Sequence, residues 1–149
     1  MKKILEAKIK ITSAISELDS SGLTVGEEEK NENETTCFYH LFEDKILISY
    51  SEESEGGRID SEIAVTENTV TVKRTGALES EFVFEDGAVH HSLYKIPPYA
   101  FDATVTTKKI RRNLSPDGGT LDLHYVLSIG GADKAARMKI WIYPLSKQT

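Results

Sequence analysis

The sequence has one cysteine, Cys37, in 149 residues. A single cysteine excludes an internal disulfide and a zinc site made of several thiolates, and it fits a reducing compartment. Long apolar runs are missing too, since none approaches the roughly 20 residues that cross a bilayer. Behind the basic start of the chain, Glu6, Lys8 and Lys10 interrupt the apolar segment that a signal peptide needs. We therefore expect a cytoplasmic protein that makes no contact with a membrane.

Positively charged residues are fewer than negatively charged ones. The chain has 18 Lys and Arg against 24 Asp and Glu, which gives a formal net charge of −6. Nucleic-acid binding depends on Lys and Arg that neutralise phosphates, so we expect no nucleic-acid partner. The basic cluster Lys108, Lys109, Arg111 and Arg112 is typical of a solvated strand end. With 39% hydrophobic and 28% charged residues, the composition indicates one globular domain, which we place at residues 1–149.

A helical period of 3.6 residues is absent, and no capping residue precedes an amphipathic run. Apolar residues instead alternate with polar ones, as in strands that bury one face. Residues 19–34 lose this alternation and are rich in Ser, Gly, Glu and Asn, which predicts a long, mobile, acidic loop. The alternation predicts ten strands, at residues 3–17, 35–42, 45–53, 58–66, 69–75, 79–84, 88–96, 99–110, 120–129 and 136–144.

Short turns join most of these strands. Gly56-Gly57, Asp86-Gly87 and Gly130-Gly131 are residue pairs that favour hairpin turns. A meander of this kind leaves two architectures, a closed barrel or a two-sheet sandwich. Closure removes the exposed edges of an open sheet. We therefore predict an all-β fold, an antiparallel up-and-down meander of about ten strands closed into a barrel.

The order of several short motifs, from about residue 36 to 143, resembles the YwiB-like family of small bacterial proteins, a domain of unknown function. The resemblance implies a calycin-like (lipocalin-like) β-barrel in the bacterial cytoplasm and no assigned activity. Pro97-Pro98 departs from the pattern, in which a glycine commonly follows the region of Tyr94. The motifs that carry it are Ile48-Ser49-Tyr50-Ser51-Glu52-Glu53, Arg74-Thr75-Gly76, Tyr94-Lys95, Thr106-Thr107-Lys108-Lys109-Ile110 and Leu123-His124-Tyr125.

Two apolar strand faces run directly into opposite charges. Ile46, Ile48 and Tyr50 lead to Glu52 on one strand, whereas Val70 and Val72 lead to Arg74 on another. A buried carboxylate and a buried guanidinium need a partner, so one interpretation is a structural ion pair that plugs one end of the barrel. The other is a ligand site in which Arg74 meets a polar or anionic head group. The ligand-site candidates are Arg74, Glu52, Tyr50, Tyr94, Thr107 and Tyr125.

Other chemistry lacks support in the sequence. Adjacent His90 and His91 point to opposite faces of a strand, and the spacing of His40 and His124 fits no zinc motif, so we expect no metal. No Gly-x-Ser-x-Gly motif is present, and paired glycines lack a following helix that would bind phosphate. We therefore predict no catalytic residue and no cofactor.

The last predicted strand is apolar on both faces, because Trp141 and Tyr143 lie opposite Ile140 and Ile142. Such a strand fits against a partner chain or the N-terminal strand, so we expect a homodimer. Three functions follow in order of preference. The first is a non-catalytic small-molecule binding module with a cavity of about 300 Å³ or more. The alternatives are a protein-interaction or homodimerising module with a filled barrel, and an enzyme of unknown class.

Overall fold

The computed structural model describes residues 3–145, which form ten antiparallel strands and no helix. The predicted all-β meander is confirmed. The strands are β1 (Lys3–Leu18), β2 (Thr24–Leu41), β3 (Ile46–Ser54), β4 (Gly57–Val65), β5 (Val70–Gly76), β6 (Ser80–Phe84), β7 (Val89–Ile96), β8 (Tyr99–Ser115), β9 (Gly118–Ile129) and β10 (Ala132–Pro144).

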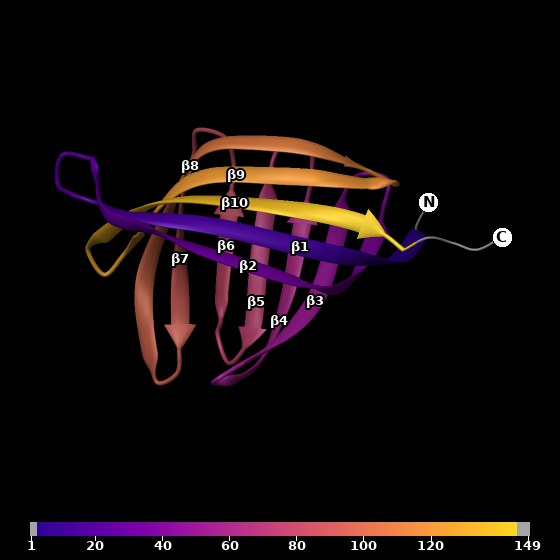
Figure 1. Ribbon diagram of the computed structural model, residues 1–149, viewed down its shortest axis with the longest axis horizontal. Coiled ribbons are helices and arrows are strands. Elements are labelled where there is room, and N and C mark those ends of the chain that lie inside the picture. Colours follow the sequence, from indigo (N-terminus) through magenta and orange to yellow (C-terminus); the bar gives the residue numbers. More distant parts are fainter. Residues whose placement is uncertain (1–2, 146–149) are drawn as a thin grey trace.

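The strands form one sheet in the order β6-β5-β4-β3-β2-β1-β10-β9-β8-β7. Neighbours in sequence pair as hairpins, and β1 also pairs with β10, where Ile9 lies opposite Ile142. Between β6 and β7 the pairing is reduced to an isolated bridge of Glu79 with Lys95, so the barrel is nearly closed. Figure 1 shows β3 to β7 running across the direction of β1, β2, β9 and β10. The calycin-like relationship stays a prediction.

The core fills the space between these two sets of strands. Alternate residues of every strand except β7 contribute buried side chains, as a period of two requires. Tyr39 is fully buried, and its hydroxyl donates to the Ser115 carbonyl at 2.7 Å, which links β2 to the end of β8. The largest fully buried side chains are Tyr39, Phe84, Ile9, Ile48, Ile63, Leu121, Leu123, Ile140, Ile142, Val70, Val105 and Thr107.

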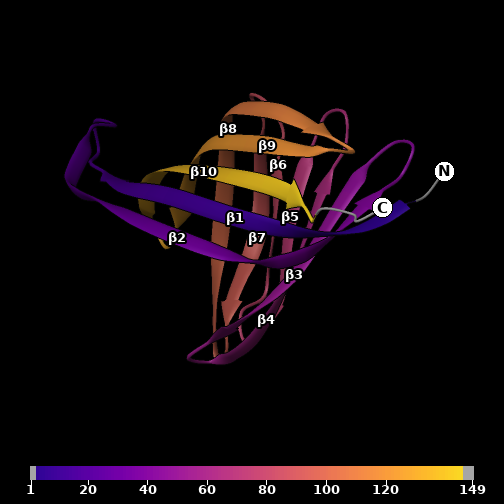
Figure 2. The same cartoon turned by 45° about the vertical axis from the view of Figure 1, so that its right-hand side comes forward.

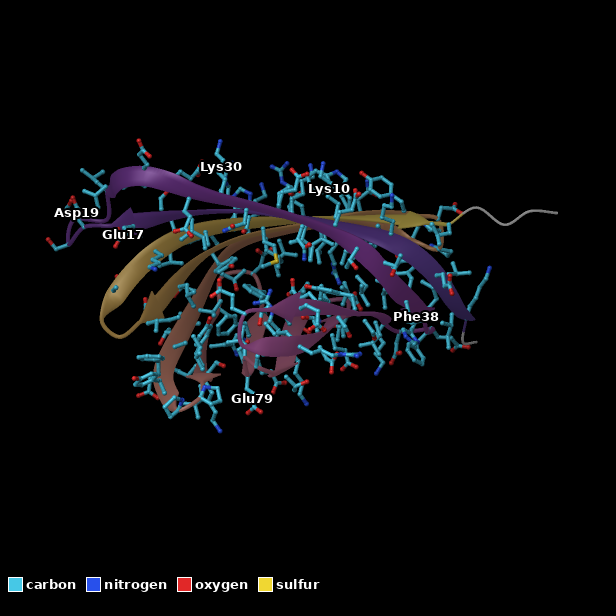
Figure 3. The ribbon with its side chains drawn as sticks, turned by 60° about the horizontal axis from the view of Figure 1, so that its bottom comes forward. Lys10, Glu17, Asp19, Lys30, Phe38 and Glu79 are labelled. Carbon is cyan, nitrogen blue, oxygen red and sulfur yellow. The ribbon has the colours of Figure 1, made fainter. Side chains whose placement is uncertain are left out.

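The predicted loop at residues 19–34 is wrong for most of its length. Only residues 19–23 turn the chain, whereas residues 24–34 are the first part of β2 and pair with β1. Figure 2 shows this hairpin reaching beyond the barrel as an arm, and Figure 3 shows Glu17 and Asp19 at its far end. Both faces of the arm on β2 meet solvent, so no apolar alternation marks it in the sequence. Lys10 and Lys8 pair across the hairpin with glutamates of β2 at 3.7 and 3.8 Å.

Glycine is required where β8 turns into β9. Gly119 has φ +132°, and a Cβ there would lie 1.9 Å from the carbonyl oxygen of Asn113. Only a residue without a side chain allows this close approach of two backbones. The turn holds Leu114 opposite Gly119 and fixes the register of β8 with β9.

Candidate functional site

A row of polar side chains crosses the inner face of four adjacent strands. Tyr50 on β3 lies opposite Ser61 on β4, Ser61 lies opposite Arg74 on β5, and Arg74 lies opposite Ser80 on β6. We call these four residues the polar row. Directly opposed side chains on one face of an antiparallel sheet lie about 4.5–5.5 Å apart at Cβ, so the four are neighbours. Ser61, Ser80 and Tyr50 are 3%, 6% and 6% exposed, which places them inside the barrel, and Arg74 is half-buried beside them.

Three atoms of the polar row are buried without a hydrogen-bond partner. They are the hydroxyl oxygens of Ser61 and Ser80 and the Nε of Arg74. Within residues 3–145 no carboxylate lies at ion-pair distance from Arg74. A buried donor left unsatisfied costs about 1–3 kcal/mol, and such atoms are rare in folded proteins. Three of them on adjacent strands form an unfilled set of hydrogen-bond sites.

Tyr125 on β9 faces the row from the other side of the barrel. Its side chain is 8% exposed and contacts Phe84 edge-on, with ring centroids 4.8 Å apart. Burial raises the pKa of Tyr125, and the positive charge of Arg74 acts in the opposite direction. This electrostatic interaction places the tyrosine near the guanidinium. The structure therefore brings together three of the predicted site residues, Arg74, Tyr50 and Tyr125.

Glu52 does not pair with Arg74. It shares the inner face but lies two residues beyond Tyr50 on β3, opposite Ile59, whereas Arg74 lies opposite Ser61. Its carboxylate accepts a hydrogen bond of 2.8 Å from the side-chain amide of Asn33 on β2. The expected ion pair is thus replaced by a bridge between β2 and β3, because the register separates the two charges.

The other two predicted residues lie where β6 and β7 meet. Tyr94 on β7 stacks on Phe82 of β6 with ring centroids 6.1 Å apart. Thr107 on β8 is 1% exposed and opposite Tyr125, and its hydroxyl accepts a hydrogen bond from the Glu85 backbone N–H at 3.2 Å. Tyr94 therefore lies at the interrupted pairing of β6 with β7, whereas the Thr107 hydroxyl is satisfied by the backbone of Glu85.

Two open hollows on the outer surface border the strands that carry the polar row. A cleft of about 680 Å³ over β2 to β5 takes in Tyr50 and Ser61. A cavity of about 510 Å³ beside β5, β6 and β7 takes in Arg74 and Ser80. Both hollows thus lie beside the row, on the other face of the same strands.

Arg58, on the outer face of β4, is a useful contrast to Arg74. Its Nε donates to Asp60 at 2.8 Å, and its terminal nitrogen donates to the Ser51 hydroxyl at 3.1 Å. Hydrogen bonds from Ser51 and Arg58 lower the pKa of Asp60. The outer guanidinium is therefore satisfied by the protein itself, whereas the buried Nε of Arg74 is not.

The remaining candidates for reactive chemistry are inert in this arrangement. Burial raises the pKa of Cys37 from its ordinary 9.0 to about 11, so the thiol stays protonated at neutral pH. Among the described residues no three His, Cys, Asp or Glu side chains gather as metal ligands would. The same residues contain no helix long and apolar enough to span a membrane.

Comparison with known proteins gives the chain a family. Residues 10–142 match the family model described as Domain of unknown function (DUF1934). The chain belongs to this family. Its resemblance to YwiB-like proteins is thereby confirmed, since it is 30% identical over 105 residues to the uncharacterized beta-barrel protein YwiB of Bacillus subtilis (strain 168). That match covers 70% of this chain and 74% of the relative.

A solved structure agrees with the fold. The crystal structure of the YwiB protein from Bacillus subtilis superposes with a TM-score of 0.78 and 26% sequence identity. The match covers 95% of this chain and 94% of the other, so the barrel is common to both. No activity comes with the family.

Sequence reasoning missed Ser61 and Ser80. A signal for both was present, because each occupies an inward position of an apolar alternation. Ser61 lies between Ile59 and Ile63, and Ser80 precedes Phe82 on the same face. A serine at an inward position of an otherwise apolar strand indicates a polar group inside the barrel.

Proposed function

We propose that this protein is a non-catalytic binding module whose polar row holds a compact anionic ligand. The observation that carries the proposal is the set of three unpartnered buried polar atoms on Ser61, Arg74 and Ser80. A guanidinium has donors only, and each serine hydroxyl can donate as well. The complementary ligand is therefore rich in acceptors, such as a carboxylate or a phosphate.

The charge balance of the site supports an anion. Arg74 is a cation without a carboxylate partner among residues 3–145, in a chain whose formal net charge is −6. Arginine binds planar or tetrahedral oxyanions with two parallel hydrogen bonds, which fix orientation as well as charge. Tyr50 and Tyr125 add an aromatic wall, and Tyr hydroxyls can donate to the same oxygens.

The test is thermal unfolding in increasing inorganic phosphate, with sodium chloride at equal ionic strength as the reference. A ligand that binds the folded state adds about 2.7 kcal/mol of stability at a concentration about 100 times Kd. We expect phosphate to raise the Tm of the wild type and of Arg58→Gln, and to leave the Tm of Arg74→Gln unchanged. Equal shifts in wild type and Arg74→Gln would refute the proposal.

Native mass spectrometry of the freshly purified protein supplies the second measurement. It reports a retained small molecule and the subunit count together. A mass increment that disappears in Arg74→Gln and persists in Arg58→Gln supports binding at the polar row. An increment that persists in Arg74→Gln places the retained molecule elsewhere and contradicts the proposal.

A further inference from the structure

The seam between β6 and β7 is the weakest line of the barrel. A single bridge pairs these strands, in which Glu79 and Lys95 exchange backbone hydrogen bonds of 2.9 and 2.8 Å. The next shortest ladder, between β2 and β3, has four residue pairs. Regions with few backbone hydrogen bonds open locally at low free energy.

Side chains hold the rest of the seam. At its middle, the rings of Phe82 and Tyr94 stack across the gap. At its far end, the Glu85 carboxylate lies 3.1 Å from Nε2 of His90. The ring stack lies between the Glu79–Lys95 bridge and the Glu85–His90 pair. The two rings must therefore separate for the middle of the seam to widen.

The seam leads to the polar row. The cavity of about 510 Å³ on its outer side is lined by both Arg74 and Ser80. The cleft at the other end of the row takes in Tyr50 and Ser61, and there the hydrogen bond from Asn33 to Glu52 ties β2 to β3. Of the two hollows, the one that borders Arg74 therefore lies at the more weakly paired seam.

We propose that the β6–β7 seam is the portal through which a compact anion reaches Arg74, with the Phe82–Tyr94 stack as its movable part. This inference rests on the proposed function, because it assigns the route to the same site. Opening separates the two rings and breaks the Glu79–Lys95 bridge, and closure restores both. Glu79 lies on the opposite side of the molecule from Lys10 in Figure 3, so the portal is far from the charged outer face of β1.

The test measures access to Arg74 with phenylglyoxal, a reagent selective for arginine, followed by peptide mass mapping. A disulfide between Glu79→Cys and Lys95→Cys locks the seam, since opposed residues that exchange both hydrogen bonds lie about 5.5 Å apart at Cα, within disulfide range. We expect the oxidised variant to modify Arg74 at least about tenfold more slowly than the reduced one, because opening of the seam exposes more of the half-buried guanidinium. Tyr94→Ala removes the stack and is expected to accelerate the reaction.

The controls separate the portal from general effects. The exposed Arg58 should react at one rate in all forms, and a disulfide between Ser16→Cys and Ala135→Cys, which face each other on the fully paired β1 and β10, should leave Arg74 unaffected. Equal rates for Arg74 with the seam locked and unlocked would overturn the portal, as would an Arg74 that never reacts. Phosphate protection of Arg74 tests the proposed function separately. If phosphate fails to protect while the lock still slows the reaction, the ligand proposal falls and the route stands.

Discussion

Replacing Arg74 with methionine is expected to stabilise the protein without ligand. Methionine keeps much of the length of the side chain and removes a guanidinium whose buried Nε has no partner. An unsatisfied buried donor costs about 1–3 kcal/mol, so its removal should raise the free energy of unfolding by an amount in that range. For a chain of this size, each kcal/mol raises the Tm by about 2–4 °C. The protein should therefore gain stability as it loses phosphate binding.

Urea unfolding, followed by circular dichroism, measures the first effect, and phosphate titration measures the second. Arg58→Met is the matched control, because this guanidinium is exposed and paired with Asp60. A solvent-exposed ion pair contributes little, so the control should change stability little and in the destabilising direction. A loss of more than about 1 kcal/mol in Arg74→Met would show that the guanidinium is satisfied in the free protein. That result would refute the reasoning.

Three further predictions concern other parts of the chain. The free energy of unfolding should fall by about 2 kcal/mol in total between pH 9 and 11 from the Cys37 thiol alone, and Cys37→Ala should remove this part of the slope. Double-mutant cycles should give a coupling of about 0.5–1 kcal/mol for Glu52 with Asn33, and none for Glu52 with Arg74. Gly119→Ala should cost more than about 3 kcal/mol in chemical unfolding, because its Cβ meets a backbone carbonyl.

The outcomes that would contradict these predictions are specific. The thiol has a raised pKa in the folded state, so its stabilising effect is complete below pH 9 and lost as pH rises towards 11. If the free energy of unfolding depends on pH in the same way in Cys37→Ala, the buried thiol with its raised pKa is contradicted. A measurable coupling energy between Glu52 and Arg74 would show that these two side chains do form an ion pair and would contradict the second prediction. For the turn, Gly22→Ala is the control, since Gly22 also has positive φ but open space around it, and an equal cost in both variants would exclude the backbone clash.

Most strands could be predicted because one face of each is buried. Val70 and Val72 on β5, or Leu121 and Leu123 on β9, make the period of two visible in the sequence. The arm was missed for the opposite reason. The first half of β2 is held by its ladder to β1 and buries neither face, so its glutamates look like a loop.

The site was predicted in part for a related reason. Alternation gives the face on which Arg74, Tyr50 and Glu52 lie, and all three do lie on the inner face. Register is set by turn geometry and by the neighbouring strands, and it decides that Ser61, not Ile59, is opposite Arg74. Sequence alternation alone could not supply that choice, so it allowed an ion pair of Arg74 with Glu52 that the register prevents.

The place where the barrel stays open could not be predicted either. It depends on the shortness of β6, five residues long, and on the pairing of the first strand with the last. Both are properties of the assembled sheet. The sequence shows only that Phe82 and Tyr94 are aromatic residues on two separate strands.

The most direct test of the account is the NMR signal of the Arg74 Nε–H, assigned by comparison with Arg74→Lys, during titration with inorganic phosphate. The account predicts a large, saturable shift of this signal, with the Arg58 Nε–H unchanged after correction for ionic strength. A signal that does not move with phosphate would contradict a polar row that holds an anion.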